Sequence, residues 1–279
     1  MKNVLQNIKN SIVFIGNIVN NQPRIVGTGF LISVDNHVHL VTAKHVIEKE
    51  FMHLGVFGNT KQLSMMSFKP FTDFYKSNLE WIRHKNNNID IAVIPFLVNQ
   101  NDKLVFIDHN LLLDNLNDLV ELSDIFYGSF QPGINNLEKD GSVNPIYRKG
   151  FVSRINNDGT FYIDSAAFPG NSGSPIFNYP SAIEINDQGV HIGSVKPVKL
   201  LGVMSSYTPY QDVAVSAQTG RTRVIFEENT GISMVFSSQF IKEIIKQENF
   251  QFQLNRLKEI EKLKEKPKDK QSENSNIKS

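Results

Sequence analysis

Short runs of Ile, Val, Leu and Phe, separated by Asn, Asp, Gly or Pro, cover most of the chain. Runs of this length between turn-forming residues predict β-strands rather than helices. In the first half the pattern predicts strands at 11–19, 24–33, 37–42, 89–97 and 104–107. In the second half it predicts strands at 125–130, 150–155, 160–163, 175–178, 199–207 and 232–237. Many short strands with few helices indicate β-barrels or β-sandwiches.

The hydrophobic pattern changes to helical spacing near the end of the chain. Apolar residues recur every three or four positions after Ser238, a candidate N-cap, and predict helix over 238–265. The later part of this stripe consists of Leu254, Leu257, Ile260 and Leu263. The stripe has two interpretations: it packs on the strands, or it binds a partner helix. Beyond it, the Lys, Ser and Asn of 266–279 predict a disordered tail.

Composition and charge exclude several classes of function. The chain of 279 residues holds 29 Lys and Arg against 28 Asp and Glu, a formal net charge of +1, so no global basic field attracts nucleic acid. The basic segment 262–270 is read as a solvated helix end rather than a nucleic-acid or lipid site. Cysteine is absent, which excludes disulfides, thiolate nucleophiles and zinc–thiolate sites.

Membrane and secretion signals are not evident in the sequence. No run approaches the roughly 18 apolar residues of a membrane span. The short apolar stretch 12–18 is broken by Gly16 and Asn17 and precedes no cleavage signal. We therefore expect a cytoplasmic protein without a membrane span.

Three short motifs carry chemistry, in the order His, Asp, Ser. His45 follows an apolar strand and a small-residue turn, and Asp90 stands at the start of another apolar strand. Ser172 lies between Gly170 and Gly173, ahead of a third apolar strand. Each motif alone is common, since such residues often serve only as caps and turns. Together they match a chemical requirement: a serine hydroxyl needs a neighbouring base, and a carboxylate can orient that base.

These motifs resemble the trypsin/chymotrypsin superfamily of serine peptidases. The resemblance is strongest to the bacterial branch that includes the glutamyl endopeptidases and the high-temperature-requirement (HtrA-type) proteases. The resemblance covers about residues 10–247. HtrA-type proteins add a PDZ domain, for which the roughly 30 residues that follow are too few. The segments that carry the resemblance are Thr42-Ala-Lys-His45, Asp90-Ile-Ala, Gly170-Asn-Ser172-Gly-Ser-Pro, Gly27-Thr-Gly-Phe-Leu-Ile, Gly150-Phe-Val-Ser and Gly231-Ile-Ser-Met-Val-Phe-Ser.

The resemblance implies an all-β, chymotrypsin-like fold: two six-stranded antiparallel β-barrels with the active site between them, and a C-terminal helix. His45 and Asp90 would come from the first barrel and Ser172 from the second. The expected boundaries are 1–109 for the N-terminal barrel, 110–122 for a linker, 123–237 for the C-terminal barrel, 238–265 for the helix and 266–279 for the tail.

The resemblance also implies residue roles. Ser172 would be the nucleophile, His45 the general base and Asp90 its orienting carboxylate. The N–H groups of Gly170 and Ser172 would form the oxyanion hole. Many family members carry an aspartate before the serine for activation by cleavage. Here Asn171 takes that position, so no such switch is expected.

Substrate selectivity is expected to depend on a few further residues. By resemblance, Ala166 and Ala167 form the floor of the primary pocket, and Met204, Ser205 and Tyr207 line its wall. No carboxylate stands at the floor, which favours a small or medium apolar side chain before the cleaved bond. A peptide or protein substrate would bind extended, as a strand added near 205–207. Ser205 would also hydrogen-bond Asp90.

Two alternatives stay open at this stage. The chain is a serine endopeptidase, or it is a latent or partner-gated module that mainly binds peptides or proteins and answers to a regulatory protein partner. No cofactor is expected. His37 and His39 share one face of a predicted strand, but a metal site would lack a third ligand, so we interpret the pair as solvated near a hairpin tip.

Overall fold

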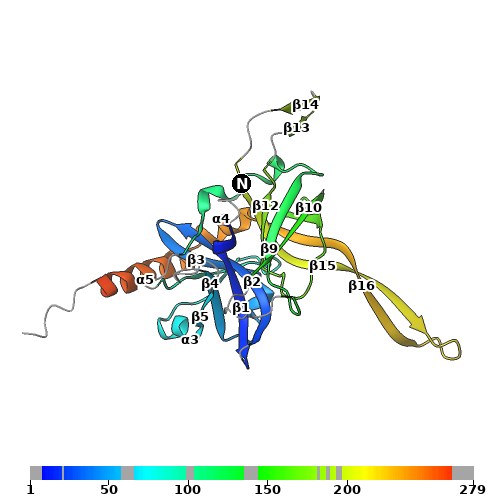
Figure 1. The fold of residues 1–279 in the computed structure, drawn as a ribbon, viewed down its shortest axis with the longest axis horizontal. Coiled ribbons are helices and arrows are strands. Elements are labelled where there is room, and N and C mark those ends of the chain that lie inside the picture. Colours follow the sequence, from blue (N-terminus) through cyan, green and yellow to red (C-terminus); the bar gives the residue numbers. More distant parts are fainter. Residues whose placement is uncertain are drawn as a thin grey trace, which may run out of the picture.

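The computed structural model describes residues 8–20, 22–57, 66–98, 104–134, 144–180, 183–186, 189–192 and 197–265. Two β units follow one another along the chain, and helices cover part of the first (Figure 1). The predicted tail 266–279 lies outside the described residues. No helix in the described part is both long and apolar enough to cross a membrane.

The first unit is an eight-stranded sheet. Its main path runs β5-β4-β1-β2-β3-β7-β6, and β8 pairs with β2 off this path. The 13-residue β2 is long enough for two partners along one edge: β1 pairs with its residues up to Phe30, and β8 continues at Ile32. The strands are β1 (Ile12–Val19), β2 (Gln22–Val34), β3 (His37–Thr42), β4 (His53–Phe57), β5 (Met66–Pro70), β6 (Ile82–Arg83), β7 (Ala92–Pro95) and β8 (Ile107–Asp108).

The second unit is a closed barrel of six antiparallel strands, in the order β10-β11-β16-β15-β12-β9. A separate small hairpin joins β13 to β14. The all-β fold with one closed six-stranded barrel is therefore confirmed, whereas the described strands of the first unit form a partly open sheet. The strands are β9 (Asp124–Ser129), β10 (Ile146–Ile155), β11 (Thr160–Asp164), β12 (Pro175–Asn178), β13 (Ile183–Asn186), β14 (Gly189–Ile192), β15 (Leu200–Val215) and β16 (Thr222–Ser237).

Helices are short except at the end of the chain. They are α2 (Lys44–Ile47), α3 (Thr72–Lys76), α4 (Gln239–Ile245) and α5 (Glu248–Glu265). Leu254 and Leu257 of α5 are fully buried, and Leu263 is exposed. The helix lies against the first sheet, with contacts to β3 and β7. The predicted apolar stripe thus packs on strands of its own chain.

His39 departs from its predicted surroundings. Its ring is fully buried and stacks on Phe250 of α5, with ring centroids 4.8 Å apart. His37, two residues earlier, lies 2.7 Å from the Glu261 carboxylate. The prediction of a solvated histidine pair is therefore wrong for His39, because α5 covers the strand that a sequence pattern alone leaves open.

The hydrophobic core has three parts. One cluster fills the first sheet and another fills the barrel. The third joins the two units, and it includes Phe14 of β1 and Phe130 after β9, whose rings meet edge to face at 5.7 Å. Buried apolar area of this kind fixes the two units against each other.

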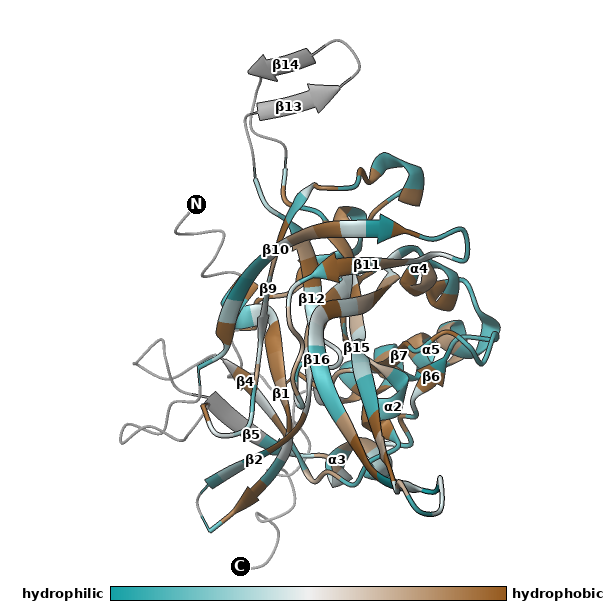
Figure 2. Cartoon of the chain, turned by 90° about the vertical axis from the view of Figure 1, so that its right-hand side faces the viewer, coloured by the Kyte–Doolittle hydropathy of each residue, from teal (hydrophilic) through white to brown (hydrophobic). Residues whose placement is uncertain are grey.

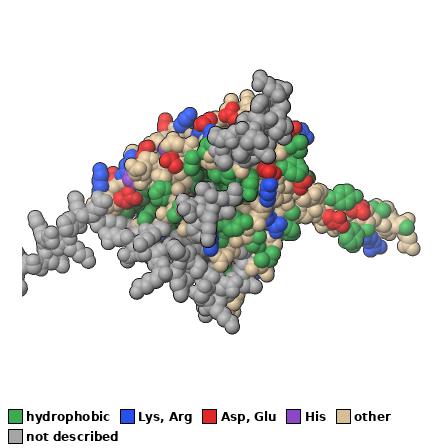
Figure 3. Space-filling model, turned by 45° about the horizontal axis from the view of Figure 1, so that its top comes forward, with side chains coloured by type: hydrophobic (Ala, Val, Ile, Leu, Met, Phe, Trp, Pro, Cys, Tyr) green, Lys and Arg blue, Asp and Glu red, His purple; other side chains and the backbone are tan. Residues whose placement is uncertain are grey.

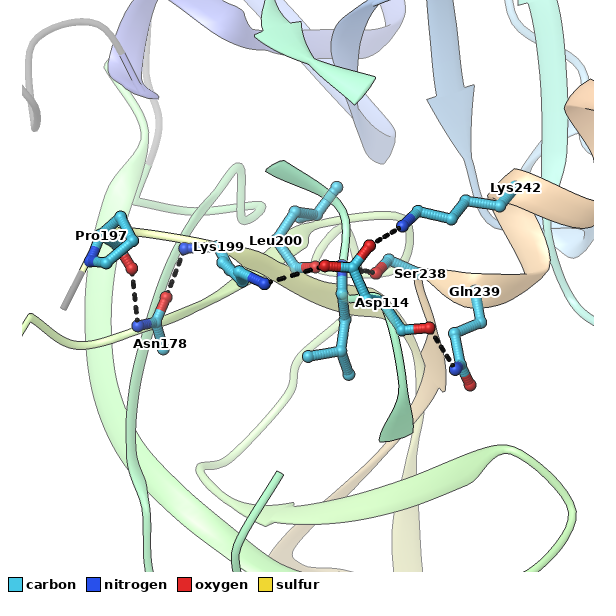
Figure 4. Close-up of polar contacts among 9 residues, drawn as sticks. Asp114, Asn178, Pro197, Lys199, Leu200, Ser238, Gln239 and Lys242 are labelled. Atoms are coloured by element: carbon cyan, nitrogen blue, oxygen red, sulfur yellow. Dashed lines mark hydrogen bonds and ion pairs between the residues drawn. The ribbon is translucent and has the colours of Figure 1, made fainter. Parts of the chain in front are cut away.

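The connection between the units is fastened by polar contacts around Asp114 (Figure 4). Its carboxylate lies 3.1 Å from Lys199 at the start of β15 and 2.6 Å from Lys242 of α4. Its carbonyl oxygen accepts a hydrogen bond from Gln239. The segment expected as a linker is thus tied to both the barrel and the helix that follows it.

β15 and β16 continue well beyond the barrel as a two-stranded ribbon, which we call the arm and define as residues 206–231 (Figure 1). The strands predicted from the sequence end at residue 207 and begin at 232, so the arm was not predicted. The strands pair with each other out to Val215 and Thr222. Along its outer part, side chains on both strands are exposed.

Candidate active site

The pairing of β3 with β7 brings His45 and Asp90 together. Thr42, the last residue of β3, pairs with Ala92, the first residue of β7. His45 therefore follows one strand at the point where Asp90 precedes its neighbour. The Lys44 N–H donates to the Asp90 carbonyl at 3.3 Å and adds a backbone contact between the two segments.

Asp90 holds His45 through two hydrogen bonds. Its Oδ1 accepts from the His45 backbone N–H at 2.9 Å, and its Oδ2 lies 2.7 Å from His45 Nδ1. An ionised carboxylate can only accept, so Nδ1 carries the proton and Nε2 is left as the basic nitrogen. The side chain of Asp90 is 13% exposed and that of His45 is 34% exposed. The carboxylate is therefore shielded while the imidazole stays accessible.

Ser205 provides a third hydrogen bond to Asp90, as the resemblance implied. Its hydroxyl donates to Asp90 Oδ2 at 2.5 Å. A register shift in the β15–β16 ladder between Met204 and Ser206 takes Ser205 out of regular pairing, a typical way for a strand to redirect a side chain. Burial alone raises the pKa of Asp90, but the hydrogen bonds from His45 and Ser205 outweigh it and hold that pKa below its ordinary value.

Ser172 lies in a tight loop just before β12. Gly170 and Gly173 flank it with φ angles of +91° and +86°, a region that other residues adopt at a cost. A Cβ atom on Gly173 would also overlap the carbonyl oxygen of Thr28 and the hydroxyl of Thr42. The glycines therefore allow the loop to turn sharply and to sit close against the first unit.

The Ser172 hydroxyl donates to the carbonyl oxygen of Ser205 at 2.9 Å. Among the described residues this is its hydrogen-bond partner, and no hydrogen bond joins the hydroxyl to His45. The three predicted residues are nevertheless linked in one site, because Ser205 contacts both Ser172 and Asp90. Ser172 as a residue is partly exposed.

Asn171 stiffens this loop from inside. Its side chain is fully buried, and its amide donates to the Ser129 hydroxyl at 2.8 Å and to the Phe130 carbonyl at 3.2 Å. Its Oδ1 accepts from the Phe168 N–H at 2.8 Å. The N–H groups of Gly170 and Ser172 donate to no other described residue.

Thr28 joins the loop to the first unit, and the sequence analysis missed this role. Its hydroxyl donates to the Gly170 carbonyl at 2.7 Å and accepts from the Phe130 N–H at 3.0 Å. Its backbone N–H donates to the Ser172 carbonyl at 2.9 Å. The segment Gly27-Thr-Gly is one of those that carry the family resemblance. The role of Thr28 could not be predicted from it, because the hydrogen-bond partners are more than 100 residues away in the sequence.

The expected pocket residues fall into two groups. Met204, expected at the pocket wall, and Ala167, expected at its floor, are both buried in the core cluster of the barrel. Neither side chain is exposed to a pocket. Ala166 is half-buried, and its carbonyl accepts from Tyr127 at 3.1 Å. The Ala167 carbonyl accepts from Asn229, at the base of the arm, at 2.6 Å. The segment 166–167 is thus held by the barrel on one side and by the arm on the other.

The described residues offer no cluster of three His, Asp or Glu side chains that could bind a metal ion. The groups that converge are a carboxylate, an imidazole, two serine hydroxyls and a glycine-flanked loop with unused N–H groups. Together with two β units, one a closed six-stranded barrel, they define the class of chymotrypsin-like proteins.

The chain belongs to the family described as the trypsin-like peptidase domain, which matches residues 27–181. The matched residues include the motifs around His45, Asp90 and Ser172, and the match confirms the predicted resemblance. No curated protein matches the chain.

Solved structures with a similar fold include serine proteases. The serine endoprotease of Yersinia pestis is 15% identical, with a TM-score of 0.47, over 88% of this chain and 65% of its own. The HtrA-type protease AlgW with a tripeptide is 13% identical, with a TM-score of 0.46, over 88% of this chain and 63% of its own. This chain thus spans just under two thirds of their lengths.

A structure from Sesbania mosaic virus, described for the coupled folding and binding of its VPg protein, is similar to the same degree. It is 13% identical, with a TM-score of 0.46, and the alignment covers 86% of this chain and 92% of the viral one.

Proposed function

We propose that the protein is a serine endopeptidase in which Ser172, His45 and Asp90 act as a catalytic triad. The observation that carries the proposal is the pair of hydrogen bonds that Asp90 accepts from the His45 backbone N–H and from His45 Nδ1, which leave Nε2 as the free base. The family supplies the reaction class, hydrolysis of peptide bonds through an acyl-enzyme.

In this mechanism the Ser172 hydroxyl turns from the Ser205 carbonyl toward His45 Nε2, which takes its proton as the oxygen attacks a peptide carbonyl. The N–H groups of Gly170 and Ser172 hold the resulting oxyanion. His45 then gives the proton to the leaving amine, and water releases the acyl group by the reverse sequence. Asp90 stays ionised throughout and stabilises the imidazolium.

A second candidate function is a latent or partner-gated module. The observation that favours it is the bond from the Ser172 hydroxyl to the Ser205 carbonyl, which directs the hydroxyl to an acceptor other than His45. A regulatory protein, or the substrate itself, would then have to displace this bond. The unused N–H groups at Gly170 and Ser172 favour the active enzyme.

The test is labelling of the purified protein by a fluorophosphonate, which reacts only with an activated serine. We expect the wild-type protein to be labelled and Ser172→Ala and His45→Ala to be unlabelled. Ser77→Ala, at a serine outside the site, is the matched control and should label normally. Folded wild-type protein that resists labelling would exclude the active triad and support the latent module.

For the residue before the cleaved bond, we propose a small or medium apolar preference. The reason is the absence of a carboxylate at Ala166 and Ala167, where the resemblance places the pocket floor. A hydrophobic pocket discriminates by only about 1–3 kcal/mol per methylene, so the preference should be loose. Cleavage-site profiling with a peptide library checks it, and cuts confined to basic or acidic residues would contradict it.

A further inference from the structure

The arm leaves one edge of β15 without a neighbouring strand. Within the barrel β15 is paired on both sides, with β16 and with β12. The pairing with β12 ends at Val203, whereas the pairing with β16 continues to Val215. Among the described residues, no strand pairs with the other side of β15 beyond this point. Met204 still pairs with Gly173 and Ser174 of the serine loop, so the free edge starts after it. From there outward the backbone groups on this side can pair with an incoming strand, which would have to displace the Asp212 carboxylate from the Val213 N–H.

This open edge begins at the candidate active site. The carbonyl oxygen of Ser205 accepts from the Ser172 hydroxyl, and the Ser205 side chain contacts Asp90. From Ser205 the strand runs outward to Val215, with register irregularities between Tyr207 and Pro209 and between Ala214 and Val215. At about 3.3 Å per residue, this stretch extends roughly 30 Å from the serine. A polypeptide lying along it would have one end at the reactive hydroxyl.

The arm also exposes several large apolar side chains to solvent. A two-stranded hairpin is marginally stable alone, and exposed apolar patches mark sites of interaction. On the projecting part of the molecule, hydrophobic side chains lie next to acidic ones (Figure 3). The outer half of the ribbon also contains hydrophobic residues (Figure 2). They are Tyr210 (58% exposed), Val213 (46%), Val215 (60%), Val224 (48%), Ile225 (57%) and Phe226 (56%).

We propose that the arm is an extended substrate-binding site, on which the polypeptide substrate forms an additional β-strand along the free edge of β15. The proposal rests on the endopeptidase function proposed above and extends it to the substrate class: unfolded chains with alternating apolar side chains. Antiparallel pairing is the more stable arrangement. In that orientation, the residues on the arm are those that precede the cleaved bond.

Pro209 divides the edge into two stretches. It has no N–H to donate, so pairing is interrupted there. The inner stretch, from Ser205 to Thr208, is the edge near which the family resemblance already places a substrate. The outer stretch, from Tyr210 to Val215, carries the exposed apolar side chains and is the new part of the site. Its occupation requires several substrate residues beyond those next to the cleaved bond.

The experiment compares two peptides with the same residues around the cut, one of which carries eight additional alternating Val and Thr residues before it. For the wild-type enzyme we expect kcat/KM for the long peptide to exceed that for the short one about tenfold or more, since several backbone hydrogen bonds are added. N-methylation of alternate residues in the extension should abolish the gain, because it removes backbone donors but retains the side chains.

The matching variant replaces residues 210–228 by Asn-Gly, which closes the ribbon after the Pro209–Asn229 pair with a two-residue turn. Its folding is checked by fluorophosphonate labelling. We expect the ratio of kcat/KM for long and short peptides to fall to about one. A gain that survives in this variant, or in the N-methylated peptide with the wild-type enzyme, would overturn the proposal.

The other outcomes separate this inference from the function on which it rests. Labelled wild-type enzyme that cuts both peptides equally well would refute the extended site and leave the endopeptidase function intact. Protein that is neither labelled nor active would refute both. A dimer seen by sedimentation, lost in the shortened variant and combined with no length dependence, would overturn the proposal and assign the arm to a second copy of the chain.

Discussion

At the scale of single residues, Asp90 has a larger role than orientation of one ring. It accepts hydrogen bonds from the His45 backbone, the His45 ring and the Ser205 hydroxyl. Asp90 therefore fixes the position of the backbone at His45, the tautomer of the His45 ring and the position of Ser205, where the free edge of β15 starts. A carboxylate can accept all three bonds because it has two oxygens and no proton.

Asp90→Asn should keep the fold and lose most of the activity. An amide has one accepting oxygen, and its NH₂ group favours the His45 tautomer with the proton on Nε2, which cannot act as the base. We expect kcat to fall about 10³–10⁴-fold, as is typical of triads with the wrong tautomer. Ser205→Ala, which leaves the carboxylate in place, should cost far less. The check is peptide hydrolysis with labelling rates, and equal losses in the two variants would contradict this assignment.

The reacting residues could be predicted from the sequence, but their supports could not. His45, Asp90 and Ser172 lie in short motifs whose order is informative by itself. The hydroxyl of Thr28 and the amide of Asn171 act through partners in other strands, and nothing local to either residue indicates those partners. The Ser172–Ser205 bond was likewise not foreseen, because it depends on the rotamer of one side chain.

At the scale of elements, strands were predicted where hydrophobic runs are bounded by turn residues. The arm was missed because its residues are polar and apolar in mixed order on a ribbon that has no core beneath it. His39 was misread for a related reason: α5, more than 200 residues later, covers its strand. The hydrophobic pattern of one strand indicates which of its residues are buried. It does not indicate which other element of the chain packs on that strand.

The burial of His39 predicts a pH-dependent stability. Burial lowers its pKa from 6.5 to about 4, although a hydrogen bond to the His37 carbonyl partly offsets the effect. Between these values the unfolded chain binds the proton and the folded chain does not, so stability is complete above about pH 6.5 and declines as the pH falls toward 4. The contribution is about 3 kcal/mol.

Urea denaturation across this pH range provides the measurement. In His39→Phe, which keeps an aromatic ring against Phe250, the free energy of unfolding should lose most of its change between pH 6.5 and 4. The control is His109→Phe, at a histidine whose side chain is 36% exposed. If His39→Phe retains the full pH dependence of the wild-type protein, the buried ring does not cause it.

At the scale of the whole molecule, the site depends on the junction of two β units. The base and the carboxylate belong to the sheet, and the serine loop belongs to the barrel. A shared core holds the units together, but apolar packing alone does not fix the position of the Ser172 loop relative to His45. Directional hydrogen bonds must do this, and Thr28 supplies three of them, two through its hydroxyl and one through its backbone.

Thr28→Val tests this coupling, because valine has nearly the same shape and cannot hydrogen-bond. The Gly170 carbonyl and the Phe130 N–H would both be left buried without their partner, at a cost of about 1–3 kcal/mol each in the free energy of unfolding. The serine loop would also lose its tie to the sheet, so the rate of fluorophosphonate labelling should fall by more than the loss of folded protein explains. Thr72→Val, at an exposed threonine of α3, is the control and should change neither quantity. Normal labelling by a destabilised Thr28→Val protein would show that Thr28 stabilises the junction without positioning the nucleophile.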